Sequence, residues 1–162
     1  MLIQKVADEM LDLYNDQKFS PRVVEDLGCL MYHLLLQQGV DLSLLHADLP
    51  IQFKASSKYP DIVVGDPQNL DQCEIVQLKF MGKGWDLQSG RITRREETSL
   101  KDLATLSQIR CKPKFFIFFN EAKPLTDKMK KRLTGSMGRD VIFILLENRQ
   151  GRMTKVQVDV TP

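Results

Sequence analysis

Cysteine and histidine are scarce in this sequence, and neither forms a pattern that would indicate a site. The three cysteines, Cys29, Cys73 and Cys111, are an odd number at wide spacings. This spacing excludes a disulfide framework and a cysteine-based zinc site. Each cysteine lies in or beside an apolar segment, so we expect all three to be reduced residues of the core. The two histidines, His33 and His46, are too few and too separated to indicate a histidine-based metal site, and we expect structural roles for them.

Long hydrophobic runs and a strong net charge are also missing. No run is long enough to cross a membrane, and the stretch 1–14 carries charged residues among its apolar positions, unlike a signal peptide. We therefore expect a cytoplasmic protein with no membrane contact. The formal net charge is only +2, so overall charge does not by itself indicate nucleic-acid binding. The length fits a single domain, 1–162, in which 1–19 is an N-terminal helical extension.

The spacing of apolar residues predicts an alternation of helices and strands. Ser20 and Pro21 are typical of a helix start, and Gly39 is typical of a helix end. Alternating or continuous apolar runs indicate the strands. The expected helices are 1–15, 20–38, 96–109 and 125–133, and the expected strands are 51–54, 61–64, 74–80, 115–119, 141–146 and 153–160. This order predicts an α/β fold in which helices flank a mixed central β-sheet.

The strand expected at 74–80 carries two polar side chains on one face. Gln77 and Lys79 project to the same side of the sheet, while Leu78 projects to the other. A lysine that lies inside a sheet without a function costs desolvation energy. Asp61 opens the preceding strand, and the turn between the two strands can bring it beside Gln77 and Lys79. We therefore expect an acid, an amide and a lysine to converge there.

These three residues suit metal-dependent phosphodiester hydrolysis. The reaction needs a divalent cation that neutralises the phosphate and activates water, and a positively charged group near that water. Asp61 supplies an anionic oxygen for magnesium, Gln77 a neutral carbonyl oxygen, and Lys79 the positive charge. The alternative interpretation is structural: Asp61 caps a turn, and Lys79 ends a strand with its ammonium group in solvent.

Two segments of the sequence resemble the halves of the PD-(D/E)XK nuclease motif. They are Tyr59-Pro60-Asp61-Ile62-Val63-Val64 and Glu74-Ile75-Val76-Gln77-Leu78-Lys79-Phe80. The order of helix, three strands, helix and strand, from about residue 21 to residue 119, also resembles the common core of that superfamily. The resemblance implies a restriction-endonuclease-like three-layer fold and a nuclease that uses Mg²⁺, with Mn²⁺ as a substitute.

The sequence departs from the motif at Gln77, where the family has an acid. Some Mrr-type restriction endonucleases are similar in carrying glutamine there. We expect a glutamate elsewhere to complete the metal site, and Glu25 is the candidate because the superfamily often places an acid on the helix before the strands. Glu74 is a weaker candidate, since it lies on the strand face opposite Gln77. The implied catalytic residues are Asp61, Gln77, Lys79 and Glu25, and the implied metal ligands are Asp61, Gln77 and Glu25.

Basic residues follow the strand that carries Lys79, and they are the candidate nucleic-acid contacts. Their loop, expected at 81–95, would overhang the site and could grip a phosphate backbone. Trp85 in this loop is interpreted either as a base-stacking residue or as an anchor of the loop to the core. The candidate contacts are Lys83, Arg91, Arg94, Arg95 and, on the next helix, Lys101.

The leading hypothesis is a small endonuclease of restriction, homing or resolvase type that cuts DNA, with RNA left open as a substrate. Cutting both strands of a duplex would require a symmetric homodimer, because the chain has little surface beyond its core. A second hypothesis is a nuclease-fold module that binds nucleic acid or a protein partner without turnover. A third is a purely structural or protein-interaction domain. Magnesium binding separates the first hypothesis from the others, and salt-sensitive nucleic-acid binding separates the second from the third.

Overall fold

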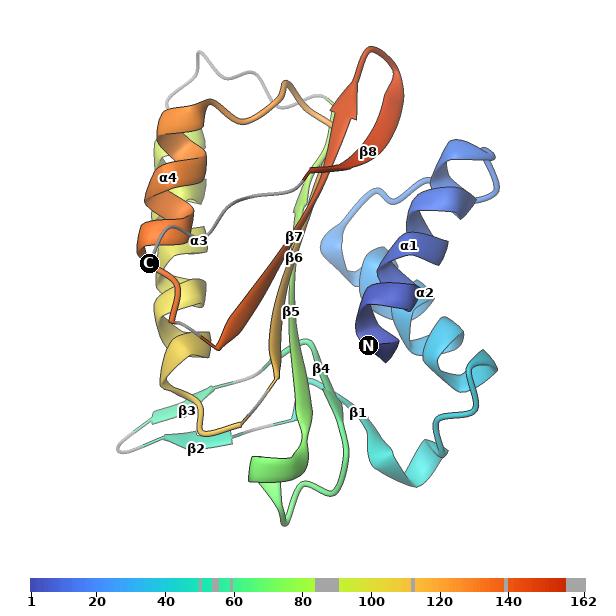
Figure 1. Ribbon diagram of the computed structural model, residues 1–162, viewed down its shortest axis with the longest axis vertical. Coiled ribbons are helices and arrows are strands. Elements are labelled where there is room, and N and C mark those ends of the chain that lie inside the picture. The colour runs from blue at the N-terminus through green and yellow to red at the C-terminus, as the bar shows by residue number, and fades with distance from the viewer. Residues whose placement is uncertain are drawn as a thin grey trace.

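A mixed β-sheet forms the middle layer of the protein, with a pair of helices on each face (Figure 1). The computed structural model describes residues 1–49, 51–53, 56–58, 60–83, 91–111, 113–138 and 140–156, and the side chains of these except at 51–58 and 91–98. Helices α1 (Leu2–Asn15) and α2 (Val24–Gln37) cover one face. Helices α3 (Arg91–Gln108) and α4 (Asp127–Gly135) cover the other. The predicted α/β class with a mixed, helix-flanked sheet is therefore confirmed.

The sheet has six strands in the order β1-β4-β5-β6-β7-β8. β4 is antiparallel to both β1 and β5, whereas β5, β6 and β7 run parallel, and β8 returns antiparallel to β7. The strands are β1 (Leu45–Ala47), β4 (Ile62–Val64), β5 (Glu74–Met81), β6 (Lys114–Asn120), β7 (Val141–Arg149) and β8 (Arg152–Val156). Two short 3-10 helices, η1 (Leu42–Leu44) and η2 (Leu70–Gln72), precede β1 and β5.

The first strand of the sheet differs from the sequence-based prediction. The strand expected at 51–54 is β2 (Ile51–Phe53), which pairs with β3 (Ser56–Lys58) in a separate two-stranded hairpin. The place in the main sheet belongs to β1, which pairs with β4. A strand of three residues is too short to show a clear alternation, so the apolar pattern alone does not reveal it.

Two helices also begin elsewhere than expected. α2 starts at Val24, not at residue 20, and the carboxylate of Asp26 accepts hydrogen bonds from the backbone amides of Arg22 at 2.7 Å and Val23 at 3.3 Å. The end of α2 is confirmed, because the chain turns at Gly39 with a φ of +87°, a conformation that glycine adopts at little cost. The helix predicted at 96–109 is α3, which extends back to residue 91, so Arg91, Arg94 and Arg95 of the predicted basic loop lie in a helix.

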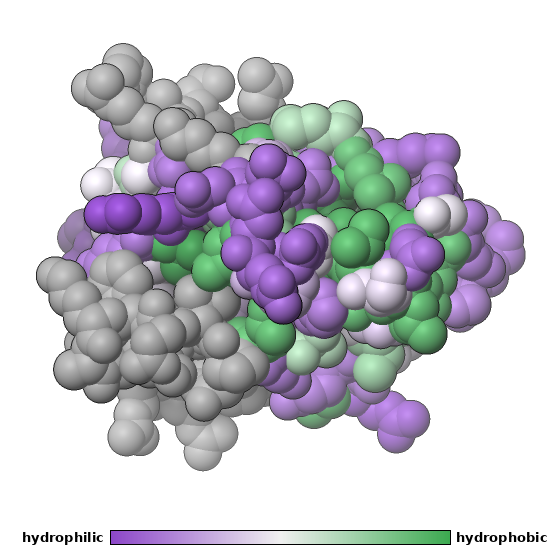
Figure 2. All heavy atoms as spheres, turned by 90° about the horizontal axis from the view of Figure 1, so that it is seen from below, coloured by the Kyte–Doolittle hydropathy of each residue, from purple (hydrophilic) through white to green (hydrophobic). Residues whose placement is uncertain are grey.

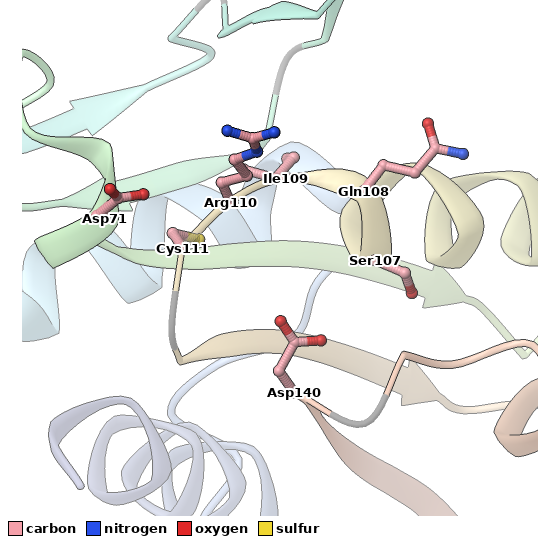
Figure 3. A pocket seen from close by; sticks show the side chains of 7 residues that line it. All are labelled: Asp71, Ser107, Gln108, Ile109, Arg110, Cys111 and Asp140. Carbon is pink, nitrogen blue, oxygen red and sulfur yellow. The ribbon is translucent and has the colours of Figure 1, made fainter.

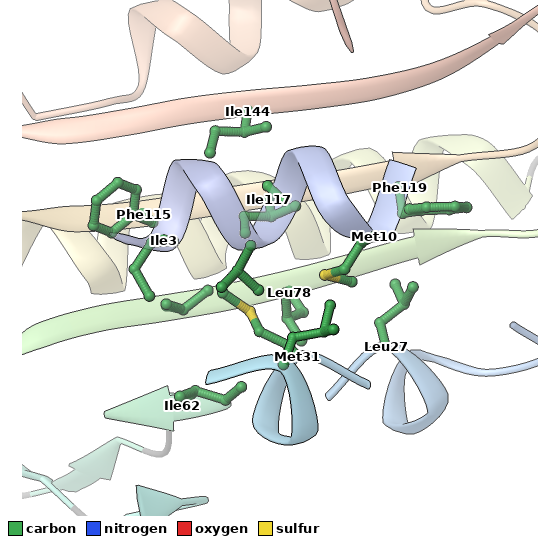
Figure 4. Close-up of a cluster of buried hydrophobic side chains, with 14 of the residues drawn as sticks. Ile3, Met10, Leu27, Met31, Ile62, Leu78, Phe115, Ile117, Phe119 and Ile144 are labelled. Atoms are coloured by element: carbon green, nitrogen blue, oxygen red, sulfur yellow. The ribbon is translucent and has the colours of Figure 1, made fainter. Parts of the chain in front are cut away.

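The central strand β6 places aromatic side chains in both halves of the core. Phe115, Ile117 and Phe119 pack with residues of α1 and α2, whereas Phe116 and Phe118 pack with residues of α3 and α4. Figure 4 shows the first set facing α1. All seven residues of β6 are buried, as expected of a strand between two helical layers. The sequence-based prediction of a strand buried on both faces is confirmed.

The cysteines divide between the core and the surface. All three are free, and Cys73 and Cys111 are buried as expected. Cys29 is exposed, so the prediction that it is a core residue is wrong. Its apolar neighbours in α2 are misleading, because the buried face of that helix is formed by Leu27 and Met31, and a residue two positions from each points elsewhere.

The lower end of the molecule exposes apolar side chains. Leu42 and Leu44 of η1 are 63% and 41% exposed, and the view from below shows hydrophobic side chains among hydrophilic ones (Figure 2). η1 runs directly into β1, the edge strand of the sheet. Among the residues that the structure describes, no helix combines the length and the apolar character needed to span a membrane.

Candidate active site

The structure brings Asp61 and Gln77 together across β4 and β5. Asp61 directly precedes β4, and the pairing of Ile62 with Val76 places it opposite Gln77. Gln77 Nε2 donates a hydrogen bond to Asp61 Oδ2 at 2.5 Å, and the backbone N–H of Leu78 donates to the same oxygen at 2.5 Å. The acid is thus attached to the strand that carries the other two candidate residues.

Lys79 forms an ion pair with Asp102 of α3. It lies on the same face of β5 as Gln77, since side chains two positions apart share a face, and its Nζ contacts the carboxylate of Asp102. The two side chains are only 21% and 29% exposed. The ammonium group is therefore held in a partly buried pair, in contrast to the structural interpretation that places it in solvent.

Burial raises the pKa of Asp61 from 3.8 to about 6. The hydrogen bond from Leu78 and the charge of Lys79 act in the opposite direction, whereas the charges of Asp48 and Asp102 raise this pKa further. Ionising the carboxyl therefore costs free energy in the metal-free protein. A strongly shifted carboxyl beside a cavity is a common feature of functional sites.

We expect Asp61→Asn to stabilise the metal-free protein as the pH rises. A carboxyl whose folded pKa is raised contributes stability below its unfolded pKa and loses that contribution as the pH rises through the folded value of about 6. Asparagine does not titrate, so the unfolding free energy of the variant relative to wild type should rise by about 2 kcal/mol between about pH 4 and pH 7.

Urea denaturation in EDTA at both pH values measures this difference. Asp12→Asn, at an exposed position of α1, is the matched control for loss of a carboxylate. An unfolding free-energy difference between Asp61→Asn and wild type that stays constant over this pH range would contradict the raised pKa.

Asp61 also borders a cavity of about 610 Å³ beside α2. Glu25, from the first turn of α2, lines the same cavity, although its side chain is exposed at the surface. The lining residues come from α2, from the ends of β1 and β4 and from β5: Val24, Glu25, Gly28, Cys29, Tyr32, Ala47, Asp48, Asp61, Ile62 and Leu78. The glutamate proposed from the sequence therefore shares a cavity with Asp61, and a third acid, Asp48, joins them there, whereas Gln77 and Lys79 are not among the residues that line it.

These residues offer oxygen ligands to a small cation, but not a complete protein cage. The described part of the chain contains no group of three or more histidine, cysteine, aspartate or glutamate side chains that could hold a metal ion. Mg²⁺ does not need one, because it is commonly bound through one or two carboxylates and keeps several waters. Gln77 presents its NH₂ group to Asp61, so its amide has to turn before the carbonyl oxygen can serve as a ligand.

The structure describes the side chains of two candidate nucleic-acid contacts, Lys83 and Lys101. Lys101 is exposed on α3. Lys83 is exposed and lines a different cavity, of about 440 Å³, together with Tyr14 and Arg152. Arg91, Arg94 and Arg95 lie in α3, but their side chains lie outside the described residues, as does the whole of Trp85.

A third cavity, of about 460 Å³, lies at the C-terminal end of α3 and includes none of the predicted site residues. Figure 3 shows its lining side chains: Asp71, Ser107, Gln108, Ile109, Arg110, Cys111 and Asp140. Nearby, the buried Lys114 donates to the backbone carbonyls of Ser107 and Ile109 and pairs with Asp140 at 2.8 Å. These contacts satisfy the carbonyl groups at the end of α3, and they anchor the helix that carries Asp102.

Sequence reasoning missed two acids, Asp48 and Asp102. Asp48 follows β1, the strand whose pattern is too short to recognise. Asp102 lies within α3, and its contact with Lys79 joins residues that are 23 positions apart. The sequence does predict a helix after the strand that carries Lys79. This prediction identifies the element that contacts the lysine, but not the contacting residue.

Comparison with known proteins assigns the chain to no family. No protein-family model matches the sequence, and no curated protein matches it. The function of the chain is therefore inferred from the residues of the site and from the elements that position them.

Proposed function

We propose that this chain is a metal-dependent nuclease of the PD-(D/E)XK type that hydrolyses phosphodiester bonds in DNA. The observation that carries the proposal is the hydrogen bond from Gln77 to Asp61, with Lys79 on the same face of β5. The order α2, β1, β4, β5, α3, β6 also supports it, because it is the order of helix, three strands, helix and strand that resembles the core of that superfamily. The β2–β3 hairpin is then an insertion between the first two strands.

Each candidate residue has a chemical role in this proposal. Asp61 and Glu25 would hold Mg²⁺, or Mn²⁺ in its place, and Gln77 would add a neutral oxygen once its amide has turned. The bound cation would neutralise the phosphate and activate water. Lys79 would set its positive charge beside that water and the developing negative charge. The cavity shared by Asp61 and Glu25 offers room for the waters that the ion retains.

DNA is the proposed substrate, and RNA is the alternative. Lys101 is an exposed cation on α3, the helix that also carries the partner of Lys79, and it would contact a phosphate of the backbone, as would Lys83 and the arginines of α3. Contacts of this kind carry no sequence information. Cleavage of both strands of a duplex would use a symmetric homodimer, which presents two copies of the site.

Plasmid cleavage tests this function directly. We expect the purified protein to nick or cut supercoiled plasmid in Mg²⁺ or Mn²⁺ and to be inactive in EDTA. Lys79→Ala should lower the cleavage rate by about 10²-fold, because it removes the positive charge that would stabilise the developing negative charge of the transition state. Lys18→Ala removes an exposed lysine from the turn after α1 and should leave the rate unchanged. Cleavage that survives Lys79→Ala at the wild-type rate would remove Lys79 from the site.

A binding module without turnover is the second candidate function. Gln77 favours it for two reasons. Its neutral amide replaces the acid of the motif, and its NH₂ group donates a hydrogen bond to an oxygen of Asp61. Such a module would bind nucleic acid in a salt-sensitive manner and would show no magnesium binding in calorimetry. Magnesium binding accompanied by cleavage would exclude it.

A further inference from the structure

The pair formed by Lys79 and Asp102 joins the middle layer of the fold to one of its outer layers. Lys79 lies in β5 and Asp102 in α3, and their side chains form an ion pair. Because both side chains are largely withdrawn from solvent, salt screens this pair less than it screens a surface pair. The contact is therefore suited to holding the lysine side chain in one position.

We infer that Asp102 is a positioning residue that fixes the ammonium group of Lys79 for phosphodiester hydrolysis. The inference rests on the proposed nuclease function and adds a residue that the motif does not include. A lysine side chain is a flexible four-carbon stem that loses rotamer entropy when it is held in one position. A fixed carboxylate limits that freedom before substrate arrives, and preorganised charges are the ones that stabilise a transition state.

The helix that carries Asp102 is itself held firmly. The neighbouring Leu103 and, one turn on, Leu106 are 0% and 1% exposed, and they pack in the same cluster as Phe116 and Phe118 of β6. Lys114 fastens the end of the helix through two backbone carbonyls. Asp102 therefore projects from a rigid element, which is what a group that positions another side chain requires.

The same geometry places Asp102 close to Asp61 without making it a partner of that residue. The charge of Lys79 lowers the pKa of Asp61 and the charge of Asp102 raises it, so both charges act on the proposed metal ligand. The described hydrogen bonds of Asp61 Oδ2 come from Gln77 and Leu78. Asp102 is thus linked to the site through Lys79, and its effect on catalysis should pass through that lysine.

Steady-state kinetics of DNA cleavage by variants of Asp102 test the inference. Asp102→Ala should lower kcat on the order of 10²-fold and leave KM within about twofold, because the misplaced ammonium group acts in the transition state and not in substrate binding. Asp102→Glu keeps the carboxylate and should recover about tenfold of that loss. Magnesium affinity, measured by calorimetry, should stay at the wild-type value in both variants.

Two controls separate positioning from structure. Asp8→Asn breaks the ion pair of Asp8 with Lys155, which spans 2.7 Å on the α1 side of the molecule, and it should leave kcat unchanged. Asp102→Asn retains the shape of the side chain and should remain folded in urea denaturation even if Asp102→Ala does not. It should still lower kcat, because the charge is lost.

The possible outcomes distinguish this inference from the proposed function. If wild type cleaves, Lys79→Ala does not, and Asp102→Ala and Asp102→Asn keep the wild-type kcat, the inference is overturned and the function stands. Loss of magnesium binding in Asp102→Asn would make the residue a metal ligand and would also overturn it. If wild type does not cleave at all, the proposed function fails and the inference fails with it.

Discussion

Asp61→Asn is expected to abolish magnesium binding and to lower the DNA cleavage rate by at least about 10³-fold, since a bound cation contributes several kcal/mol of transition-state stabilisation. The substitution exchanges the anionic oxygen for a neutral amide of nearly the same shape. Its carbonyl oxygen can still accept the hydrogen bond from the backbone N–H of Leu78, which spans 2.5 Å in the wild-type protein. The fold should therefore persist while the ligand is lost.

Calorimetry with Mg²⁺ and plasmid cleavage measure the two losses. The same variant is expected to be more stable than wild type in EDTA above about pH 6, because the buried carboxyl no longer has to ionise. Lost activity combined with gained stability is the behaviour of a residue kept for function at a cost to the fold. Asp12→Asn should retain both metal binding and cleavage. An Asp61→Asn variant that still binds Mg²⁺ and cuts DNA would contradict the assignment of Asp61 as a ligand.

The strands that carry the site could be predicted because their sequence patterns are local. Residues of β5 alternate between the two faces of the sheet, and a short connection that contains η2 separates them from β4. The proximity of Asp61 and Gln77 follows from that hairpin. The direction of the Gln77 amide does not, because an amide offers both a donor and an acceptor, and the choice depends on the carboxylate it meets.

The parts that could not be predicted depend on contacts between distant segments. The partner of Lys79 is a residue of α3, and the sequence has no local signal that distinguishes Asp102 from any other polar position of that helix. The pairing of β1 with β4 also joins separate segments of the chain. β1 has only three residues, and the alternation of apolar and polar residues is clearer at 51–53. Local periodicity therefore identified most elements, whereas pairing across the sheet and between layers required the structure.

Deletion of residues 1–19 should have the largest effect on stability, although the sequence suggests only a helical extension. Ile3, Val6, Ala7 and Met10 of α1 are 0% exposed and belong to the core cluster that includes β6 (Figure 4). Burial of one large apolar side chain contributes about 1.5–3 kcal/mol, so loss of this face removes an amount comparable with the whole stability of a typical domain, about 5–15 kcal/mol.

α1 also has a polar connection to the far edge of the sheet. The side chain of Asn15 donates to the backbone carbonyl of Met153 at 3.0 Å and accepts from its backbone N–H at 2.9 Å, which joins the end of α1 to β8. Deletion leaves these backbone groups of β8 without their partner, and an unsatisfied buried group costs about 1–3 kcal/mol. The truncated chain should therefore show no cooperative thermal unfolding by circular dichroism.

Point variants separate the effect of lost side-chain packing from the effect of deleting the whole segment. Met10→Ala should stay folded but lose about 2–5 kcal/mol of unfolding free energy, because it opens a cavity against β6. Asp12→Ala, at an exposed position of the same helix, should change that free energy by about 0.5 kcal/mol or less. A truncated protein that unfolds cooperatively at the wild-type midpoint would show that the sheet and the other three helices form a complete core without α1.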